Sequence, residues 1–499
     1  MKLQAKSTIQ GVPHQKISTE AIKPEALLVV QTLRDGGYEA YLVGGCVRDL
    51  IIGRTPKDWD VTTNATPEQI IPLFEKTFYE NSFGTVGVVL DTEVIEVTPY
   101  RIESEYKDGR RPESVSFSTK IEDDLKRRDF TMNALAYCPI SDSLIDLFDG
   151  IKDIKDKTVR AVGDAEQRFR EDGLRVLRAV RFAAELGFTI NKETEKALYD
   201  SRETLAKIAL ERIRDEFSKI IMSDSPMVSI FMCQKLDILK YILPELEEGL
   251  DTEQNQAHSY TVFEHLLRSL QCAADKKYPF EVRLAALLHD IGKPESRRFS
   301  KEKGDYTFYG HEVIGARMSK KILERFNFPR KTIELIVNYV RWHMFFSDTE
   351  QITLSAVRRM IANVGRENIW NLMNLRICDR VGTGRPKENP YRLRKYTAMI
   401  EQVLMDPISV GMLKIDGKHL MDMLHVEPGP KIGFILSAIL EQVIEDPSKN
   451  ELPKLEEMAR KMNEMDIQEL KTLAEKGKKT KEAKEKEALE AILKKHHVS

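Results

Sequence analysis

The chain has few cysteines, and none of them is placed to form a pair. Five cysteines are scattered over 499 residues, and no two of them stand in a CxxC motif. An odd number of scattered thiols is typical of reduced cysteines and argues against a disulfide framework. The sequence also lacks a leader-like apolar segment and any long uncharged apolar run, so neither secretion nor a membrane span is indicated. We expect a soluble cytoplasmic protein.

An excess of charge of one sign is lacking as well. The 77 basic and 79 acidic residues leave a net charge of -2. Such a balance gives no sign of nucleic-acid binding by itself, although a local basic patch can be hidden within it. With 41% hydrophobic and 31% charged residues, the composition is that of a globular chain rather than a disordered one. The length predicts about two to four domains.

Strand and helix patterns divide the chain near residues 149–150. Before this point, short apolar runs and turn residues alternate with one helical segment, which predicts a mixed α/β head. From residue 165 onward the strand pattern ends and helical periodicity predicts an all-helical body. The expected strands are residues 39–43, 59–62, 86–90 and 94–97, and the expected helices are 24–35, 171–186, 205–222, 262–274, 282–290, 311–326 and 331–339.

Two aspartates in the head have the spacing of metal ligands. Asp58 and Asp60 lie two positions apart in a strand-like segment, so both carboxylates should project from one face. Glu96 alternates with apolar neighbours in another expected strand and could supply a third carboxylate. Three such groups would hold Mg²⁺ for phosphoryl transfer with two metal ions. Taken alone, an Asp-x-Asp pair is as often a solvated strand edge.

A glycine pair comes shortly before these aspartates. Gly44 and Gly45 follow an expected strand, and a turn without Cβ atoms lets the backbone approach a phosphate closely. Arg48 and Asp49 follow about one turn into the next helix. A glycine pair by itself is most often only a turn. Its combination with Asp58 and Asp60 in one short segment favours a nucleotide site.

A second pair, Asp172 and Arg175, could distinguish nucleobases. In a helix spanning residues 171–186 the two side chains share one face. Cytosine and adenine both offer an amino donor beside a ring nitrogen acceptor, which complements an aspartate that accepts and an arginine that donates. Uracil and guanine offer the reverse and would leave both side chains unpaired. Helix spacing alone favours the simpler alternative, an intrahelical ion pair of about 0.3–0.5 kcal/mol.

The body carries a set of histidines and aspartates suited to a transition metal. His265, the adjacent His289 and Asp290, and Asp379 form an H…HD…D pattern, and His311 and His343 fall between the last two groups. Imidazole and carboxylate together suit Mg, Mn, Fe, Ni or Co. A lone histidine is more often a packed or surface residue, and His258 is assigned no role.

The head motifs together resemble those of the class II tRNA nucleotidyltransferase and bacterial poly(A) polymerase family. Residues 42–50 and 53–60 are similar to its first motif, 127–135 to its second, 146–150 to its hinge and 171–182 to its nucleotide-selecting motif. This resemblance implies a polymerase-beta-like head in an α+β multidomain protein. It implies catalytic roles for Asp58, Asp60 and Glu96, and nucleotide-binding roles for Gly44, Gly45, Arg48, Arg128, Asp129, Asn133, Asp172, Arg175, Arg178 and Arg181.

The H…HD…D pattern resembles that of the HD phosphohydrolase superfamily. The likeness implies a metal site of His265, His289, Asp290 and Asp379, with His311 and His343 nearby or on a second metal. Its metal would be Mg²⁺ or a divalent transition metal, and its substrates 2′-phosphates or 2′,3′-cyclic phosphates at RNA ends. The expected domains are a nucleotidyltransferase head (25–150), a helical neck (151–245), an HD domain (255–385) and a helical body and tail that would bind the acceptor and T arms of tRNA (386–499).

The expected function is addition of C, C and A to tRNA 3′ ends from CTP and ATP with Mg²⁺ in the head. Residues 100–117 resemble the flexible loop that CC-only members of the family lack, which argues against CC-only addition. Gly173 departs from the Pro or Ala common in the family and could loosen the template pair. The alternatives are an A-adding enzyme with a CC-adding partner, a poly(A) polymerase, an HD phosphohydrolase with a non-catalytic head, and a non-catalytic RNA-binding protein. The Lys/Glu-rich tail from about residue 471 is assigned no function.

Overall fold

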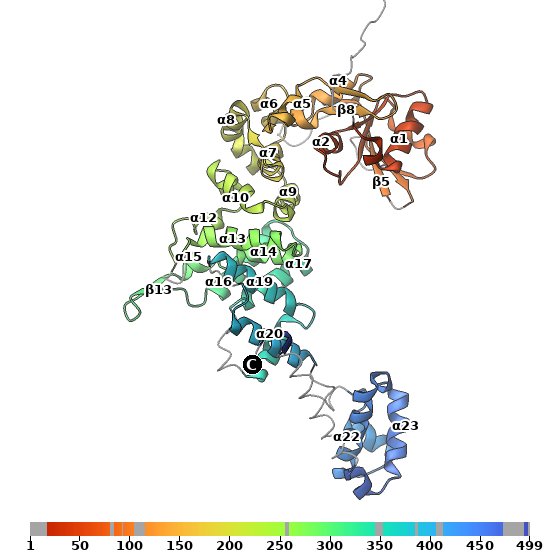
Figure 1. Cartoon of the computed structure of the whole chain (residues 1–499), viewed down its shortest axis with the longest axis vertical. Coiled ribbons are helices and arrows are strands. Elements are labelled where there is room, and N and C mark those ends of the chain that lie inside the picture. The colour runs from red at the N-terminus through yellow and green to blue at the C-terminus, as the bar shows by residue number, and fades with distance from the viewer. Residues whose placement is uncertain are drawn as a thin grey trace, which may run out of the picture. The chain divides into compact units, whose positions relative to one another are not determined.

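The computed structural model describes residues 17–79, 84–91, 93–103, 115–254, 259–344, 353–384, 388–405, 413–472 and 494–497 (Figure 1). The chain forms two compact units. The first comprises Met1–Arg341 together with Cys378–Gly384, and the second comprises Trp342–Ile377 and Arg385–Ser499. His258, most of the expected loop 100–117 and nearly all of the Lys/Glu-rich tail lie outside the described residues.

A mixed sheet forms the centre of the head. Its strands lie in the order β3-β4-β5-β2-β1-β8-β9, and only β2 and β5 run parallel. The strands are β1 (Ala40–Val43), β2 (Asp60–Thr63), β3 (Thr77–Tyr79), β4 (Val86–Leu90), β5 (Glu93–Pro99), β8 (Leu135–Cys138) and β9 (Ser143–Asp146). A separate hairpin joins β6 (Arg101–Glu103) to β7 (Val115–Phe117). The four expected strands are present, β4 with both predicted ends, whereas β3, β8 and β9 were not predicted.

Short helices complete the head. They are α1 (Pro24–Asp35), α2 (Gly45–Ile51), α3 (Pro67–Ile70), α4 (Ile121–Lys126) and α5 (Gly150–Lys155). The helix α1 has both predicted ends and contacts β1, β2 and β5 through a buried stripe at helical spacing, Ala26, Val29, Val30 and Leu33. The helix α2 begins directly after Gly44, as expected from the glycine pair.

The helices that follow form the neck. They are α6 (Ala165–Glu171), α7 (Leu174–Leu186), α8 (Lys192–Ser201), α9 (Leu210–Met222), α10 (Pro226–Lys235), α11 (Leu239–Ile242) and α12 (Pro244–Glu247). The prediction of one helix over residues 171–186 is wrong, because α6 ends at Glu171 and Asp172 has extended backbone (φ -144°, ψ 102°). The Asp172 carboxylate instead accepts a hydrogen bond from the Leu174 amide, 3.2 Å away, which starts α7. The predicted helix 205–222 begins only at Leu210, after a 3-10 helix, Arg202–Lys207.

The last part of the first unit is mainly helical. It contains α13 (Val262–Asp275), α14 (Phe280–Leu288), α15 (Lys293–Ser296), α16 (His311–Arg325), α17 (Arg330–Trp342, which ends in the second unit) and the end of α19 (Ile369–Gly382). The expectation that no strands follow residue 165 is wrong. The short β10 (Thr158–Val159) and β11 (Thr189–Ile190) pair in parallel, and β12 (Arg298–Ser300) and β13 (Asp305–Thr307) form a hairpin that Figure 1 shows extending from the helices around it.

The second unit is helical in its described residues. It contains α18 (Leu354–Val364), the first part of α19, α20 (Tyr391–Met405), α21 (Gly417–Leu424), α22 (Pro430–Glu445) and α23 (Leu452–Asn463). The last three helices enclose an apolar core in which Leu420, Ile435, Ile439 and Leu455 are fully buried. Among the described helices, none is long and apolar enough to cross a membrane.

Candidate active sites

A cleft in the head gathers the three expected carboxylates. Asp60 begins β2 and stands opposite Glu96 of β5 in the parallel register, while Asp58 lies just before the strand. Asp58, Asp60 and Glu96 line one cleft together with Lys57 and Lys23, and we call it the carboxylate cleft. The alternation expected around Glu96 is present, since Ile95 and Val97 are buried and Glu96 is exposed. Asp58 lies before β2, so strand alternation does not position it, although both aspartates line the same cleft.

The charges of the carboxylate cleft fit a divalent cation. Burial raises the pKa of Asp60, Arg128 lowers it and the neighbouring charge of Asp58 raises it. Two carboxylates that disfavour each other's ionised form gain from a cation held by both. Hard oxygen ligands of this kind suit Mg²⁺.

Gly44 lies beside this cleft and has no room for a side chain. Its φ of +81° is in the left-handed region, and a Cβ atom there would lie 2.9 Å from Arg128 Nη1 and 3.8 Å from Asp60 Oδ2. Its amide donates to the carbonyl of Leu135 on β8. A side chain at this position would therefore displace Arg128 from beside Asp60. This close contact requires glycine here in addition to the left-handed backbone of the turn.

Buried polar side chains connect α2 of the head to α7 of the neck through the expected nucleotide-binding residues. Arg48 donates to Asp49 Oδ1 at 2.8 and 2.9 Å and to Asn133 Oδ1 at 2.7 Å. Asn133 donates in turn to Asp129, which also binds Arg178 of α7 at 2.7 and 2.8 Å. Burial alone would raise the pKa of Asp129, but the charge and hydrogen bond of Arg178, with the Asn133 hydrogen bond, lower it to about 2. Asp129 is therefore ionised at neutral pH and anchors Arg178.

Phe182 of α7 is surrounded by three of the expected arginines. The guanidinium carbons of Arg181, Arg48 and Arg178 lie 4.1, 5.1 and 5.3 Å from the ring centroid. Arg181 is further fixed by Glu216 of α9 and by Glu185, 2.7 Å away. Contacts of cations with a ring face hold planar guanidinium groups in place. Three arginines of the expected nucleotide site thus meet at one ring, and each is also paired with a carboxylate.

The expected base-selecting pair is held by partners that the sequence did not suggest. Asp172 receives both Nη atoms of Arg212 of α9, at 2.7 and 3.1 Å. Arg175 donates to Glu171 at 2.8 Å and to the carbonyls of Arg168 and Arg127 at 3.0 and 2.9 Å. The simple alternative, an ion pair between Asp172 and Arg175, is not what binds either side chain in this structure.

Several residues near the head site were missed in the sequence. Arg212 holds Asp172, Glu171 holds Arg175, and the buried Asp124 binds Arg127 and Arg128, the latter at 3.1 Å. Glu171 and Asp124 stand three or four positions from their partners, so helical spacing could have suggested them. Nothing in the local sequence links Arg212 to a residue forty positions before it.

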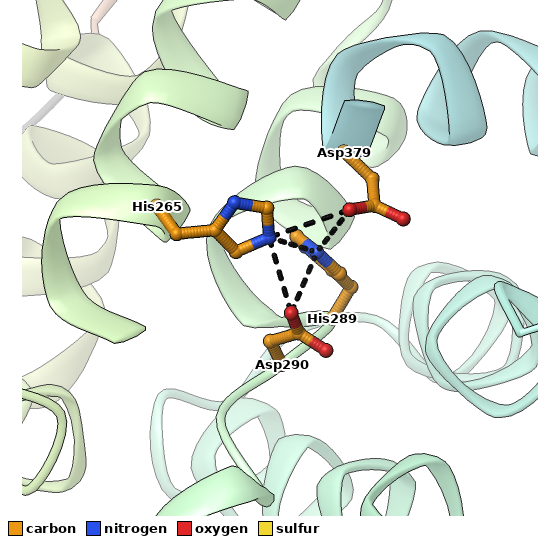
Figure 2. Close-up of side chains that lie close together, drawn as sticks. All are labelled: His265, His289, Asp290 and Asp379. Carbon is orange, nitrogen blue, oxygen red and sulfur yellow. Dashed lines mark hydrogen bonds and ion pairs between the residues drawn. The ribbon is translucent and has the colours of Figure 1, made fainter. Parts of the chain in front are cut away.

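In the first unit, four side chains from α13, from the segment just after α14 and from α19 meet. Figure 2 shows His265 of α13, His289 and Asp290 after the end of α14, and Asp379 of α19, which we call the histidine–aspartate cluster. The Nε2 atoms of the two histidines are 3.0 Å apart, and Asp290 Oδ2 is 3.1 and 3.3 Å from them. Asp379 Oδ1 lies 3.4 and 3.7 Å from the same two nitrogens. All four residues are buried. The prediction that His289 and Asp290 end the helix 282–290 needs a small correction, because α14 ends at Leu288.

The donor atoms of this cluster fit a divalent metal ion. His289 Nδ1 lies 3.0 Å from the Ala286 carbonyl, which can only accept, so Nδ1 donates, and Nε2 would offer its lone pair to a metal ion once the ring is neutral. Burial lowers the pKa of His289, but the charge and hydrogen bond of Asp290 with the hydrogen bond to Asp379 raise it to about 9. The ligand atoms of the two imidazoles and two carboxylates all lie within 4.8 Å of one another and form a mixed nitrogen and oxygen ligand set.

Two further side chains contact Asp290. His311 Nε2 at the start of α16 lies 3.1 Å from its Oδ1, and the buried Lys293 Nζ lies 2.6 Å from its Oδ2. Lys293 was not singled out in the sequence, although its place three residues after Asp290 could have suggested the contact. His343 is fully buried and belongs to the second unit, so its expected part in this site stays a prediction.

Three family models match the chain in order. The Poly A polymerase head domain matches residues 40–160, the model described as "Probable RNA and SrmB- binding site of polymerase A" matches 187–250, and the HD domain matches 257–381. The first includes Asp58, Asp60 and Glu96, and the third includes the whole histidine–aspartate cluster.

Curated relatives and a solved structure resemble the chain over most of its length. The CCA-adding enzyme of Lactiplantibacillus plantarum is 32% identical over 446 residues, which are 88% of this chain and 96% of that enzyme. The CCA-adding enzyme of Leuconostoc mesenteroides is 43% identical over a shorter alignment that spans 51% of this chain and 65% of that enzyme. The crystal structure of the Bacillus stearothermophilus CCA-adding enzyme in complex with CTP matches with a TM-score of 0.58 at 27% identity and covers 89% of this chain and 98% of that one.

Proposed function

Because this chain belongs to the family of CCA-adding enzymes, we propose that it adds C, C and A in turn to the 3′ end of tRNA, with CTP and ATP as substrates. The observation that carries the proposal is the carboxylate cleft, in which Asp60 and Glu96 stand side by side on parallel strands beside Asp58. An oxygen ligand set next to fixed arginines suits the transfer of a nucleotide from a triphosphate.

In this reaction the 3′-hydroxyl of the tRNA loses its proton to solvent, its oxygen bonds to the α-phosphorus, and the bond from that phosphorus to pyrophosphate breaks. Asp58, Asp60 and Glu96 are the residues that would hold Mg²⁺, which supplies positive charge to the attacking oxygen and the triphosphate. Arg48, Arg128, Arg178 and Arg181 would bind the triphosphate, together with the close backbone at Gly44 and Gly45. Asn133 holds Arg48 in position, and Asp129 holds Arg178.

Base selection would depend on Asp172 and Arg175. Arg212 and the Leu174 amide use three of the roughly four acceptor positions of the Asp172 carboxylate, so Oδ2 keeps capacity to accept from an amino group of cytosine or adenine. An N–H of Arg175 would donate to the neighbouring ring nitrogen. Uracil and guanine present a carbonyl to Asp172, and the resulting mismatch in a buried site excludes them.

An incorporation assay tests this function. Transcripts of tRNA that end before CCA, after C or after CC are incubated with each nucleoside triphosphate. We expect C addition to the first two and A addition to the third, with no further extension. Activity on the CC-ended transcript alone would identify an A-adding enzyme instead, and unlimited extension with ATP would identify a poly(A) polymerase.

A second activity is favoured by the histidine–aspartate cluster. We propose that it binds a divalent transition metal or Mg²⁺ and hydrolyses 2′-phosphates or 2′,3′-cyclic phosphates at RNA ends. Its four buried ligands do not take part in the head reaction. In the test, the protein is first treated with a chelator to remove bound metal ions. Hydrolysis of a nucleoside 2′,3′-cyclic phosphate is then measured after addition of Mg²⁺, Mn²⁺, Ni²⁺ or Co²⁺. No hydrolysis with any of the four would contradict the second activity.

The proposed domains keep the boundaries expected from the sequence. They are a head (25–150), a neck with the selecting residues (151–245), an HD domain (255–385) and a helical body that binds the acceptor and T arms of tRNA (386–499). We further propose that the protein acts in the cytoplasm, since its five cysteines are buried and form no disulfide.

A further inference from the structure

The β12–β13 hairpin has a surface that neither proposed activity explains. It occupies the connection between α15 and α16 and pairs Arg298–Ser300 with Asp305–Thr307. A two-stranded hairpin has little core of its own, so its exposed side chains either keep it soluble or bind a partner. Nothing in the nucleotide-transfer site requires it.

The hairpin region exposes two aromatic rings. Tyr309 is 75% exposed and Phe299 is 60% exposed, the two highest values among the large hydrophobic side chains of the described residues. Phe299 packs edge-on against Tyr306, with the ring centroids 5.5 Å apart. Rings that are held in place but open to solvent are suited to stacking on a flat partner.

Basic residues alternate with these rings. Arg297, Arg298, Lys301 and Lys303 outnumber Glu302 and Asp305 in the segment 297–309. Arg297 stacks 3.7 Å above the Tyr306 ring, and Lys303 Nζ binds the hydroxyl of Tyr309 at 2.7 Å. An aromatic surface with an excess of positive charge complements a polyanion that carries flat bases.

The hairpin is joined to the histidine–aspartate cluster at both ends. It follows Lys293, whose Nζ contacts Asp290, and it precedes His311, which contacts Asp290 from the other side. Phe308 connects the two. Its ring lies 5.6 Å from Lys293 Nζ, and its carbonyl accepts from His311 Nδ1 at 2.6 Å. A strand of RNA bound along the hairpin would therefore lead toward the cluster.

We propose that the β12–β13 hairpin binds the single-stranded end of an RNA chain, with bases stacked on Phe299 and Tyr309 and phosphates next to Arg298 and Lys301. The histidine–aspartate cluster then acts on the end of a polynucleotide in preference to a free mononucleotide. This substrate class rests on the proposed phosphoesterase activity. In that reaction a water oxygen bonds to phosphorus, one ribose oxygen leaves the cyclic phosphate, and a proton from the water passes to that oxygen.

The test compares two substrates in the full-length protein. One is a short oligoribonucleotide ending in a 2′,3′-cyclic phosphate, and the other is adenosine 2′,3′-cyclic phosphate. In the double variant Phe299→Ala, Tyr309→Ala, we expect KM for the oligonucleotide to rise about tenfold or more, because two stacking surfaces are lost. The kcat and KM for the mononucleotide should be unchanged. This second substrate also reports that the variant is folded and that its cluster is intact.

A matched variant and a crosslink complete the experiment. Phe231→Ala removes an aromatic ring on α10 that is 43% exposed and lies near a lysine, and it should leave both substrates unaffected. An oligoribonucleotide with 4-thiouridine near its end should crosslink to residues 297–309 under ultraviolet light. If the mononucleotide is hydrolysed while the double variant handles the oligonucleotide like the wild type, the role of the hairpin is refuted. If neither substrate is hydrolysed, the phosphoesterase activity fails, and a missing crosslink to these residues then also refutes the hairpin.

Discussion

Arg212 is the side chain that fixes the direction of the Asp172 carboxylate. Both of its Nη atoms donate to Asp172, and the pair is only partly exposed to solvent. A two-point contact between a guanidinium and a carboxylate fixes orientation as well as distance. If Asp172 reads the amino group of the base, Arg212 is a positioning residue for base selection even though it need not touch the base.

Replacement of Arg212 tests this role. Arg212→Ala frees the Asp172 carboxylate, and we expect the preference for CTP and ATP over UTP and GTP to fall about tenfold, the size of a lost charged hydrogen bond. The rate with CTP itself should fall less. Arg212→Lys keeps the charge but not the two-point contact, so it should restore only part of the selectivity. The measurement is single-turnover incorporation of each of the four nucleotides.

Arg214 provides the control for this variant. It lies on the same helix but pairs with Asp215 and the carbonyl of Asn327. Arg214→Ala should leave base selectivity unchanged. An equal loss in both variants would mean that α9 matters only for general stability, and unchanged selectivity in Arg212→Ala would reject its positioning role.

At the scale of elements, the break between α6 and α7 decides where the proposed base-selecting residues, Asp172 and Arg175, lie. Gly173 fills the break, and a Cβ atom there would lie 2.6 Å from Thr204 Oγ1 and 2.9 Å from the Thr204 carbonyl carbon. The sequence suggested that a glycine here loosens the template. The structure gives the opposite reason for it, because the chain at Thr204 packs too closely for any side chain.

The variant Gly173→Ala should therefore destabilise the neck. Overpacking against backbone atoms costs about 1–3 kcal/mol, which we expect to appear as a lower Tm in thermal denaturation. Adding Thr204→Ala removes only the hydroxyl contact and should recover part of the loss. Gly433→Ala in α22 is the matched control, since a Cβ atom there meets nothing within 4 Å and alanine favours a helix. A Gly173→Ala protein as stable as the wild type would contradict the packing argument.

At the scale of the whole molecule, two candidate active sites share one chain. The carboxylate cleft lies at strands of the head, whereas the histidine–aspartate cluster comes from α13, the segment just after α14, and α19. The two sets have no residue in common. A substitution in one site should therefore abolish the activity of that site and leave the other activity intact.

Single substitutions should separate the two activities. Asp60→Asn removes a proposed metal ligand and a charge from the head, and we expect nucleotide incorporation to fall about 100-fold or more while hydrolysis of cyclic phosphate persists. His289→Ala should do the reverse and also lower the metal content of the purified protein, measured by mass spectrometry of the dissolved ions. Loss of both activities in either variant, with an unchanged Tm, would show that the sites depend on each other.

Local sequence patterns predicted those helices and strands that are defined by neighbouring residues alone. The helix α1 and the strand β4 have the predicted ends because apolar spacing and turn residues define them within a few positions. The strand β8 was missed because it is buried along its whole length and shows no alternation, and β3 because it is a short edge strand. The break at Asp172 was missed because helical periodicity continues across it.

The sequence by itself determined which chemical groups are present and the order in which they occur: the glycine pair, the two aspartates, Asp172 with Arg175, and the histidine–aspartate pattern. These signals are readable because each motif lies within a few neighbouring residues or in a fixed order along the chain. Only the tertiary structure decided which groups meet. The pairing of Asp60 with Glu96 depends on strand register, and the contact of Asp172 with Arg212 depends on the packing of α9 beside α7. Such partners are chosen by backbone pairing and side-chain packing between distant segments, which no local pattern records.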